Sequence, residues 1–193
     1  MIIFYQIPDD SKAEKLREIL AADGTSHMYV YKEAAGHTIG ELFAGDTIAK
    51  AHPDASLPED PGVIFNANDT SHEEATKFLE KLAENQIIFG YQVLADESMM
   101  DLPLGDVLVG HRDYQQFLGK LAFLQQMIDG CGALKQESYD PDKWSDLKIA
   151  VANANDFLDA VVNDTDSQFD EIDPKDVDGL IVKLQSAMQR LLN

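Results

Sequence analysis

The chain contains short apolar runs typical of strands and apolar stripes typical of helices, and the strand-like runs cease near residue 110. Before that point, four short runs of apolar, β-branched and aromatic residues predict strands at residues 2–7, 27–31, 62–66 and 89–94. Between the first two runs, between the last two, and throughout the chain after residue 110, apolar residues recur every three or four positions. This period predicts amphipathic helices, so the chain begins with mixed structure and ends with helices alone.

The first 110 residues contain the same order of elements twice, over residues 1–50 and again over residues 62–110. Each repeat predicts a strand, a helix, a second strand and a short helix, and capping boxes of the form Ser/Thr-x-x-Glu begin at Ser11, Thr38 and Ser71. Alignment at offsets of 61, 62, 63 and 65 pairs Ile3 with Ile64, Leu20 with Leu82, Val30 with Val93 and Ile39 with Leu104. We attribute the increase of the offset from 61 to 65 to small loop insertions. The pattern predicts a β-α-β-α duplication, whose parallel strand pairs form one sheet covered by helices.

Three helices are predicted after residue 110. The first has an apolar stripe from Tyr114 to Ile128 and ends near Gly130–Gly132. The others begin at Asp140-Pro141 and Asp173-Pro174, because Asp is suited to the N-cap and Pro to the first helical position. Three amphipathic helices with short connections predict a three-helix bundle over residues 111–193.

Trp144 shares its predicted stripe with Leu147 and Val151. We therefore expect Trp144 in the core of the bundle, in preference to an exposed aromatic binding pair with Tyr139. Taken together, the patterns predict an α+β protein in which a small α/β domain, residues 1–110, is followed by the helical bundle.

Each half also resembles a known family. The opening Ile-Ile-Phe-Tyr-Gln-Ile-Pro-Asp-Asp and the element Thr38-Ile-Gly-Glu-Leu42 resemble an uncharacterised Gram-positive bacterial family, which suggests a fold and transfers no catalytic residue. Tyr139-Asp-Pro-Asp-Lys-Trp144, with the apolar positions that follow it and Asp176-Val-Asp178, resembles the FIVAR module over about residues 113–192. That resemblance implies a three-helix spacer or binding unit of the kind found in Gram-positive cell-surface and carbohydrate-acting proteins.

Composition and charge narrow the classes of partner. The chain has 193 residues, of which 45% are hydrophobic, and its 35 acidic and 15 basic residues give a net charge of −20. Nucleic acid and anionic membranes are excluded as partners, because both would be repelled. No apolar stretch reaches the ~18 residues of a membrane span, and no basic signal-peptide region begins the chain. Because Cys131 is also the only cysteine, we expect a cytoplasmic protein without a disulfide.

No catalytic, cofactor-binding or metal-binding residue is assigned from the sequence. Gly105-x-x-x-x-Gly110 has the first spacing of a phosphate-binding loop, but His111-Arg112 follow it in place of Lys-Ser/Thr. Gly36-His37-Thr38 precedes a helix, where an ordinary cap is favoured over an anion site. The five histidines are not paired at helical or strand spacing, which favours structural roles over a metal site.

The acidic segment 163–172 leaves weak calcium binding open. Its side-chain oxygens from Asp164 to Gln168 fall on alternate residues, as in a calcium loop. However, Phe169 and Lys175 occupy the positions at which an EF-hand needs Gly and Glu. A solvated loop between two helices is therefore favoured.

These observations favour a non-enzymatic cytoplasmic interaction or regulatory protein, whose bundle presents a helical face to a protein partner. One alternative is a small-ligand sensor that uses the crevice at the strand ends of the α/β domain, where a cavity near residues 36–41 or 102–108 would support it. A third is an enzyme with an unrecognised site. The biological process, the identity of any partner or ligand and the oligomeric state are left open by the sequence.

Overall fold

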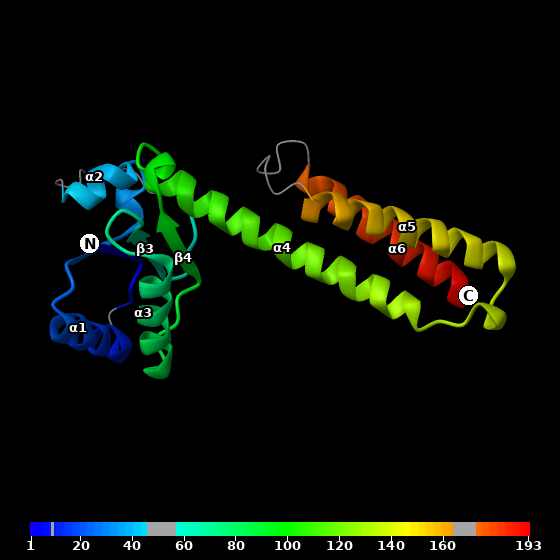
Figure 1. The fold of residues 1–193 in the computed structure, drawn as a ribbon, viewed down its shortest axis with the longest axis horizontal. Coiled ribbons are helices and arrows are strands. Elements are labelled where there is room, and N and C mark those ends of the chain that lie inside the picture. Colours follow the sequence, from blue (N-terminus) through cyan, green and yellow to red (C-terminus); the bar gives the residue numbers. More distant parts are fainter. Residues whose placement is uncertain (9, 46–56, 164–172) are drawn as a thin grey trace. The chain divides into compact units, whose positions relative to one another are not determined.

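The computed structural model describes residues 1–8, 10–45, 57–163 and 173–193 (Figure 1). The described residues divide into two compact units, Met1–Asp113 and Tyr114–Asn193. The first unit contains strands and helices and the second contains helices, so the predicted α+β fold class is confirmed. The division falls inside one long helix, α4 (Leu104–Gly132), close to the boundary expected at residue 110.

The first unit contains four strands, β1 (Ile2–Tyr5), β2 (His27–Val30), β3 (Gly62–Asn66) and β4 (Tyr91–Ala95). They form one sheet in the order β2-β1-β3-β4. β1 pairs with β2 and β3 pairs with β4 in parallel, as the β-α-β order predicts, whereas β1 and β3 are antiparallel. The α-helices that precede α4 are α1 (Ser11–Asp23), between β1 and β2, α2 (Ile39–Ala44), between β2 and β3, and α3 (His72–Glu84), between β3 and β4.

The central pairing relates the two repeats by an approximate twofold axis. Ile3 lies opposite Ile64, which are the two residues that the sequence alignment equates. The neighbouring pairs are Ile2 with Phe65 and Phe4 with Val63. At the offset of 61, Ile2 corresponds to Val63 and Phe4 to Phe65, so the two pairs are equivalent. The first strands of the two repeats, β1 and β3, therefore pair with each other at the middle of the sheet.

The alignment of Val30 with Val93 was wrong by two residues. Val30 pairs with Tyr5 at the end of β1, whereas Ala95 pairs with Asn66 at the end of β3, so Val30 corresponds to Ala95 at an offset of 65. Side chains in a strand point to alternate faces, so a shift of two residues leaves each side chain on the same face. The apolar pattern therefore does not reveal such a shift. The longer connection between α3 and β4, compared with that between α1 and β2, accounts for most of the added offset.

Helices cover both faces of the sheet, which gives this unit two apolar cores (Figure 1). The buried residues on the face of α1 and α3 are Ile2, Phe4, Ile7, Ala13, Leu16, Leu20, Val63, Phe65, Ala75, Leu82, Ile87 and Phe89. Those on the face of α2 and the start of α4 are Ile3, Tyr5, Val30, Ala34, Ile39, Leu42, Ile64, Tyr91, Val93, Ala95, Leu104, Val107 and Leu108.

Two of the three predicted capping boxes are formed. Thr38 caps α2 and Ser71 caps α3, and in each case the hydroxyl accepts the N–H of a glutamate whose carboxylate accepts the N–H of the cap. The third prediction was wrong in its residue, because the N-cap of α1 is Asp10 and not Ser11. The Asp10 carboxylate accepts the N–H groups of Lys12 and Ala13 at 2.9 and 3.1 Å.

The second unit is the predicted helical bundle. It consists of the part of α4 after Asp113, α5 (Pro141–Asn163) and α6 (Pro174–Leu192). Asp140 accepts backbone N–H groups at the start of α5, and Asp173 does so at the start of α6, as predicted. The buried residues of the bundle are Phe117, Leu124, Ile128, Cys131, Leu147, Ala154, Val161, Val177, Leu184, Ala187 and Leu191.

The short helix expected near residue 104 and the helix expected after residue 111 are one continuous helix, α4, of 29 residues. No proline lies between them, and a glycine inside a helix weakens it by only about 1 kcal/mol. Within the described parts of the chain, no helix is both long enough and apolar enough to cross a membrane.

Candidate functional site

The outer edge of β4 offers unpaired backbone groups. The N–H of Tyr91 donates to Pro61 O at 3.4 Å, and the C=O of Ala95 accepts from Ala67 at 2.8 Å, so both residues face β3. The two backbone groups of a strand residue point to the same side and the side alternates. Gln92 and Leu94 therefore direct their N–H and C=O groups away from the sheet, and no described strand pairs with them.

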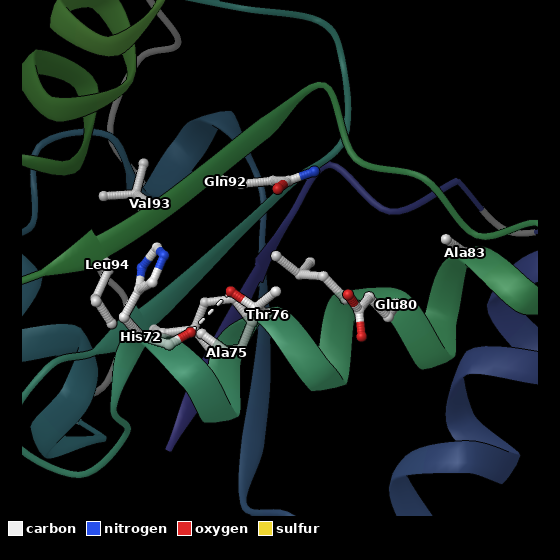
Figure 2. Close-up of a pocket in the computed structure, with 10 residues that line it drawn as sticks. His72, Ala75, Thr76, Glu80, Ala83, Gln92, Val93 and Leu94 are labelled. Carbon is white, nitrogen blue, oxygen red and sulfur yellow. Dashed lines mark hydrogen bonds between the residues drawn. The ribbon is translucent and has the colours of Figure 1, made fainter.

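A hollow of about 380 Å³ lies between this edge and α3 (Figure 2). Gln92 and Leu94 are on the same face of the sheet as Val63 and Phe65, their partners on β3, and this is the face that α3 covers. The hollow is lined by Phe65, His72, Ala75, Thr76, Leu79, Glu80, Ala83, Gln92, Val93 and Leu94. Apolar side chains form its floor, and polar ones lie along its rim.

The other repeat shows why space remains at this position. Arg17, His27 and Tyr29 correspond to Leu79, Gln92 and Leu94 when α1 and α3 are aligned at an offset of 62 and β2 and β4 at 65. In repeat 1 the rings of His27 and Tyr29 lie 5.3 Å apart, and both contact Phe4. The second repeat, residues 62–110, has the smaller side chains Leu79, Gln92 and Leu94 at the equivalent positions, so less of the space between α3 and β4 is filled. The sequence carries no signal for this hollow, because local patterns do not show how completely the side chains of a strand and a distant helix fill the space between them.

One acidic side chain, that of Glu80, lines the hollow. Lys77 pairs with Glu73 at 2.6 Å, and Lys81 pairs with Asp23 at 2.6 Å, so carboxylates already bind the two lysines of α3. Among the described residues, no cation forms an ion pair with Glu80. A group that docks in the hollow would therefore meet an uncompensated negative charge.

At the two segments considered as anion or phosphate sites, backbone N–H groups already donate to other groups of the protein. Beside His37, the N–H of Thr38 donates to Glu41, and the N–H of Gly40 donates to Met100 O at 2.9 Å. The N–H of Gly105 likewise donates to Ala35 O at 2.9 Å. The ordinary cap is therefore what the structure contains at Gly36-His37-Thr38.

The strand ends do not form the single crevice on which the sensor hypothesis relied. Because β1 and β3 are antiparallel, the carboxyl ends of the β1–β2 pair and the β3–β4 pair lie at opposite ends of the sheet. The segments at 36–41 and 102–108 instead contact one another through an antiparallel bridge between Thr38 and Pro103.

The bundle places Tyr139 and Trp144 together. Their rings stack with centroids 6.0 Å apart, and both half-buried side chains pack against the core of the bundle. Trp144 thus joins the core, as expected from its stripe, and pairs with Tyr139 as well. Both Trp144 and Cys131 line a second hollow of about 470 Å³, and burial raises the pKa of the Cys131 thiol, so this cysteine is a poor nucleophile.

A shallow groove follows the line between α5 and α6. Ile149 and Val182 line it, and each is 59% exposed. Asp146 of α5 and Arg190 of α6, 3.5 Å apart, also line the groove. Exposed apolar side chains and charged side chains thus lie together along this groove.

Candidate metal ligands are not gathered in the described part of the chain. Within residues 1–8, 10–45, 57–163 and 173–193, no three His, Cys, Asp or Glu side chains are placed to hold an ion. The calcium candidate lies outside this part, because residues 164–172 are not described.

Comparison of the chain with protein-family models, with curated proteins and with solved structures gives no match. The two family resemblances therefore stay predictions.

Proposed function

We propose that this protein is a non-enzymatic protein-interaction protein, whose partner contributes an extended segment that pairs with the free edge of β4. The observation that supports this function is the position of an apolar hollow directly beside unpaired strand groups. Strand addition uses both features, because main-chain hydrogen bonds hold the segment and pockets select alternate side chains.

Simple magnitudes show why both features are needed. Four backbone groups, the N–H and C=O of Gln92 and of Leu94, are available on the outer edge. At a net 0.5–1.5 kcal/mol each, four hydrogen bonds contribute roughly 2–6 kcal/mol. Association costs an estimated 4–15 kcal/mol in lost freedom of motion, so the bonds alone give little binding. Burial of a partner's apolar side chain in the hollow supplies the remainder.

The test removes one edge donor without disturbing the sheet. Proline at position 92 lacks an N–H, and the N–H of Gln92 has no partner among the described residues, so Gln92→Pro breaks no bond of the β3–β4 ladder. Gln92→Ala is the matched control, because it shortens the side chain and keeps the N–H. We expect full-length wild type and Gln92→Ala to retain a partner protein from a lysate of the native host, and Gln92→Pro to lose it.

A second pair of variants tests the hollow itself. Thr76 is exposed on the rim, so Thr76→Trp fills the hollow without changing the core. Glu14 occupies the corresponding position on α1, and Glu14→Trp adds the same side chain on the other repeat. Capture that survives both Gln92→Pro and Thr76→Trp at wild-type yield would reject the β4 edge as the docking site.

The bundle offers a second docking surface for the same function. The exposed pair Ile149 and Val182 on α5 and α6 supports it, because exposed apolar side chains in a groove between two helices bind the apolar face of an amphipathic helix. Ile149→Lys places a charge in this groove. A partner held there would be lost with Ile149→Lys and retained with Gln92→Pro, which separates the two surfaces.

A further inference from the structure

We infer that the segment that docks on β4 carries an apolar residue and a basic residue two positions apart. This inference rests on the strand addition proposed above and specifies the chemistry of the partner. It follows from the spacing of strand side chains, from the two different ends of the hollow and from the charge of Glu80.

The spacing comes from the sheet itself. On β3, Val63 and Phe65 point to the face covered by α3, and Gln92 and Leu94 continue this pattern on β4. A strand added beside β4 would place alternate side chains on the same face, about 6.6–6.8 Å apart. Two of its side chains would therefore lie over the hollow, one beside Leu94 and one beside Gln92.

The two ends of the hollow differ in chemistry. Figure 2 shows Leu94 near His72 at one end, and Gln92 on the side of Glu80 and Ala83 at the other. Phe65 and Ala75 are buried and form the apolar floor beside Leu94. An apolar side chain of the added strand therefore fits beside Leu94.

The end near Gln92 favours a cation. A docked strand would remove water from the Glu80 carboxylate, and the loss of hydration is unfavourable unless an opposite charge replaces it. Because Glu73 and Asp23 already bind Lys77 and Lys81, the described part of the chain provides no cation for Glu80. The net charge of −20 also attracts a basic segment and repels an acidic one.

The experiment is a selection from a displayed library of random heptapeptides with the full chain as bait. Wild type and Glu80→Lys are selected in parallel. Glu18→Lys is the matched control, because Glu18 is the exposed counterpart of Glu80 on α1 and the substitution changes the net charge equally. We expect wild type and Glu18→Lys to enrich peptides with an apolar residue and Lys or Arg two positions apart, in an order set by the strand direction.

The same peptides, made synthetically, should bind Glu80→Lys at least tenfold more weakly than wild type in a titration. Peptides that bind through the Gln92 N–H but show no basic preference, or that bind Glu80→Lys as tightly as wild type, would overturn the charge inference and leave strand addition standing. Peptides indifferent to Gln92→Pro and Thr76→Trp, or a library that yields no binder, would overturn strand addition and this inference with it.

Discussion

Two glycines bring the repeats into contact through their backbones. The N–H of Gly40 donates to Met100 O, and the N–H of Gly105 donates to Ala35 O. At an offset of 65, Gly40 corresponds to Gly105 and Ala35 to Met100, so the two hydrogen bonds are equivalent. A Cβ added at Gly40 would lie 3.1 Å from Met100 O, and one at Gly105 would lie 3.3 Å from Ala35 O. Both positions therefore need glycine for close approach, which explains why the Ile-Gly and Leu-Gly elements recur in the sequence.

Gly105→Ala tests this contact against a glycine of the same helix. The added methyl group would also lie 3.2 Å from a Leu57 methyl, and relief of such overpacking costs typically 1–3 kcal/mol. No heavy atom lies within 4 Å of a Cβ at Gly110, so Gly110→Ala should stabilise α4 by roughly 0.5–1 kcal/mol. Urea unfolding should move in opposite directions for the two variants. Equal stabilisation by both would mean that the backbone contact is not tight.

Tyr5 makes stability sensitive to alkaline pH. Its side chain is fully buried, its hydroxyl donates to Pro58 O at 2.9 Å, and burial, followed by the nearby Glu59, raises the pKa of Tyr5 from 10.0 to about 12. The folded protein therefore holds this proton more tightly than the unfolded chain. The contribution to stability is complete below pH 10 and is lost as the pH rises from 10 through about 12.

Tyr5→Phe should therefore lose less stability than wild type over this range. The comparison uses the free energy of unfolding in urea, measured at several values from about pH 9 to about pH 12. The two proteins differ in one hydroxyl alone, so the difference between the two curves reports Tyr5. Parallel curves would contradict the assignment.

At the scale of elements, local patterns predicted which segments form helices and strands more accurately than where they begin. All four predicted strands are present, but β1 ends at Tyr5 because Gln6 has a φ of 52°, which leaves the extended region. The start of α1 was predicted one residue late. Asp10 and Ser11 are both good N-caps in sequence, and only the backbone geometry at Asp10, with φ −135° and ψ −176°, distinguishes them.

Variants at these two residues test the start of α1. Asp10→Ala removes two hydrogen bonds to the backbone and the favourable charge at the helix N-terminus, and should cost about 1 kcal/mol. Ser11→Ala replaces the first residue inside the helix by a better helix former and should cost nothing measurable. Thermal unfolding of the two variants is the measurement. A larger loss for Ser11→Ala would restore the capping box that the sequence predicted.

At the scale of the whole molecule, charge is the dominant surface property. The net charge of −20 on 193 residues creates self-repulsion that opposes the compact state. Salt screens this repulsion, since the Debye length falls from about 30 Å at 0.01 M to about 10 Å at 0.1 M.

The midpoint temperature should therefore rise by several degrees between about 0.01 M and 0.3 M salt, equally for NaCl and KCl. A midpoint that does not change below 0.1 M would show that self-repulsion is not felt by the folded chain. A larger rise with CaCl₂ than with MgCl₂ at equal ionic strength would instead reveal specific binding of calcium.

The sequence alone determined the class of the fold, the number and order of the described strands, the existence of the duplication and the three helices of the bundle. It could do so because these depend on local periods of apolar residues and on caps and turns within a few positions. Only the tertiary structure decided that Val30 corresponds to Ala95, that α4 is continuous, and that β1 and β3 meet antiparallel. The same is true of the candidate site, because the hollow beside Leu94 depends on which side chains of a strand and a distant helix fill a shared space. The spacing of apolar residues indicates which face of an element is buried, but it does not indicate how completely the space beside that face is filled by side chains.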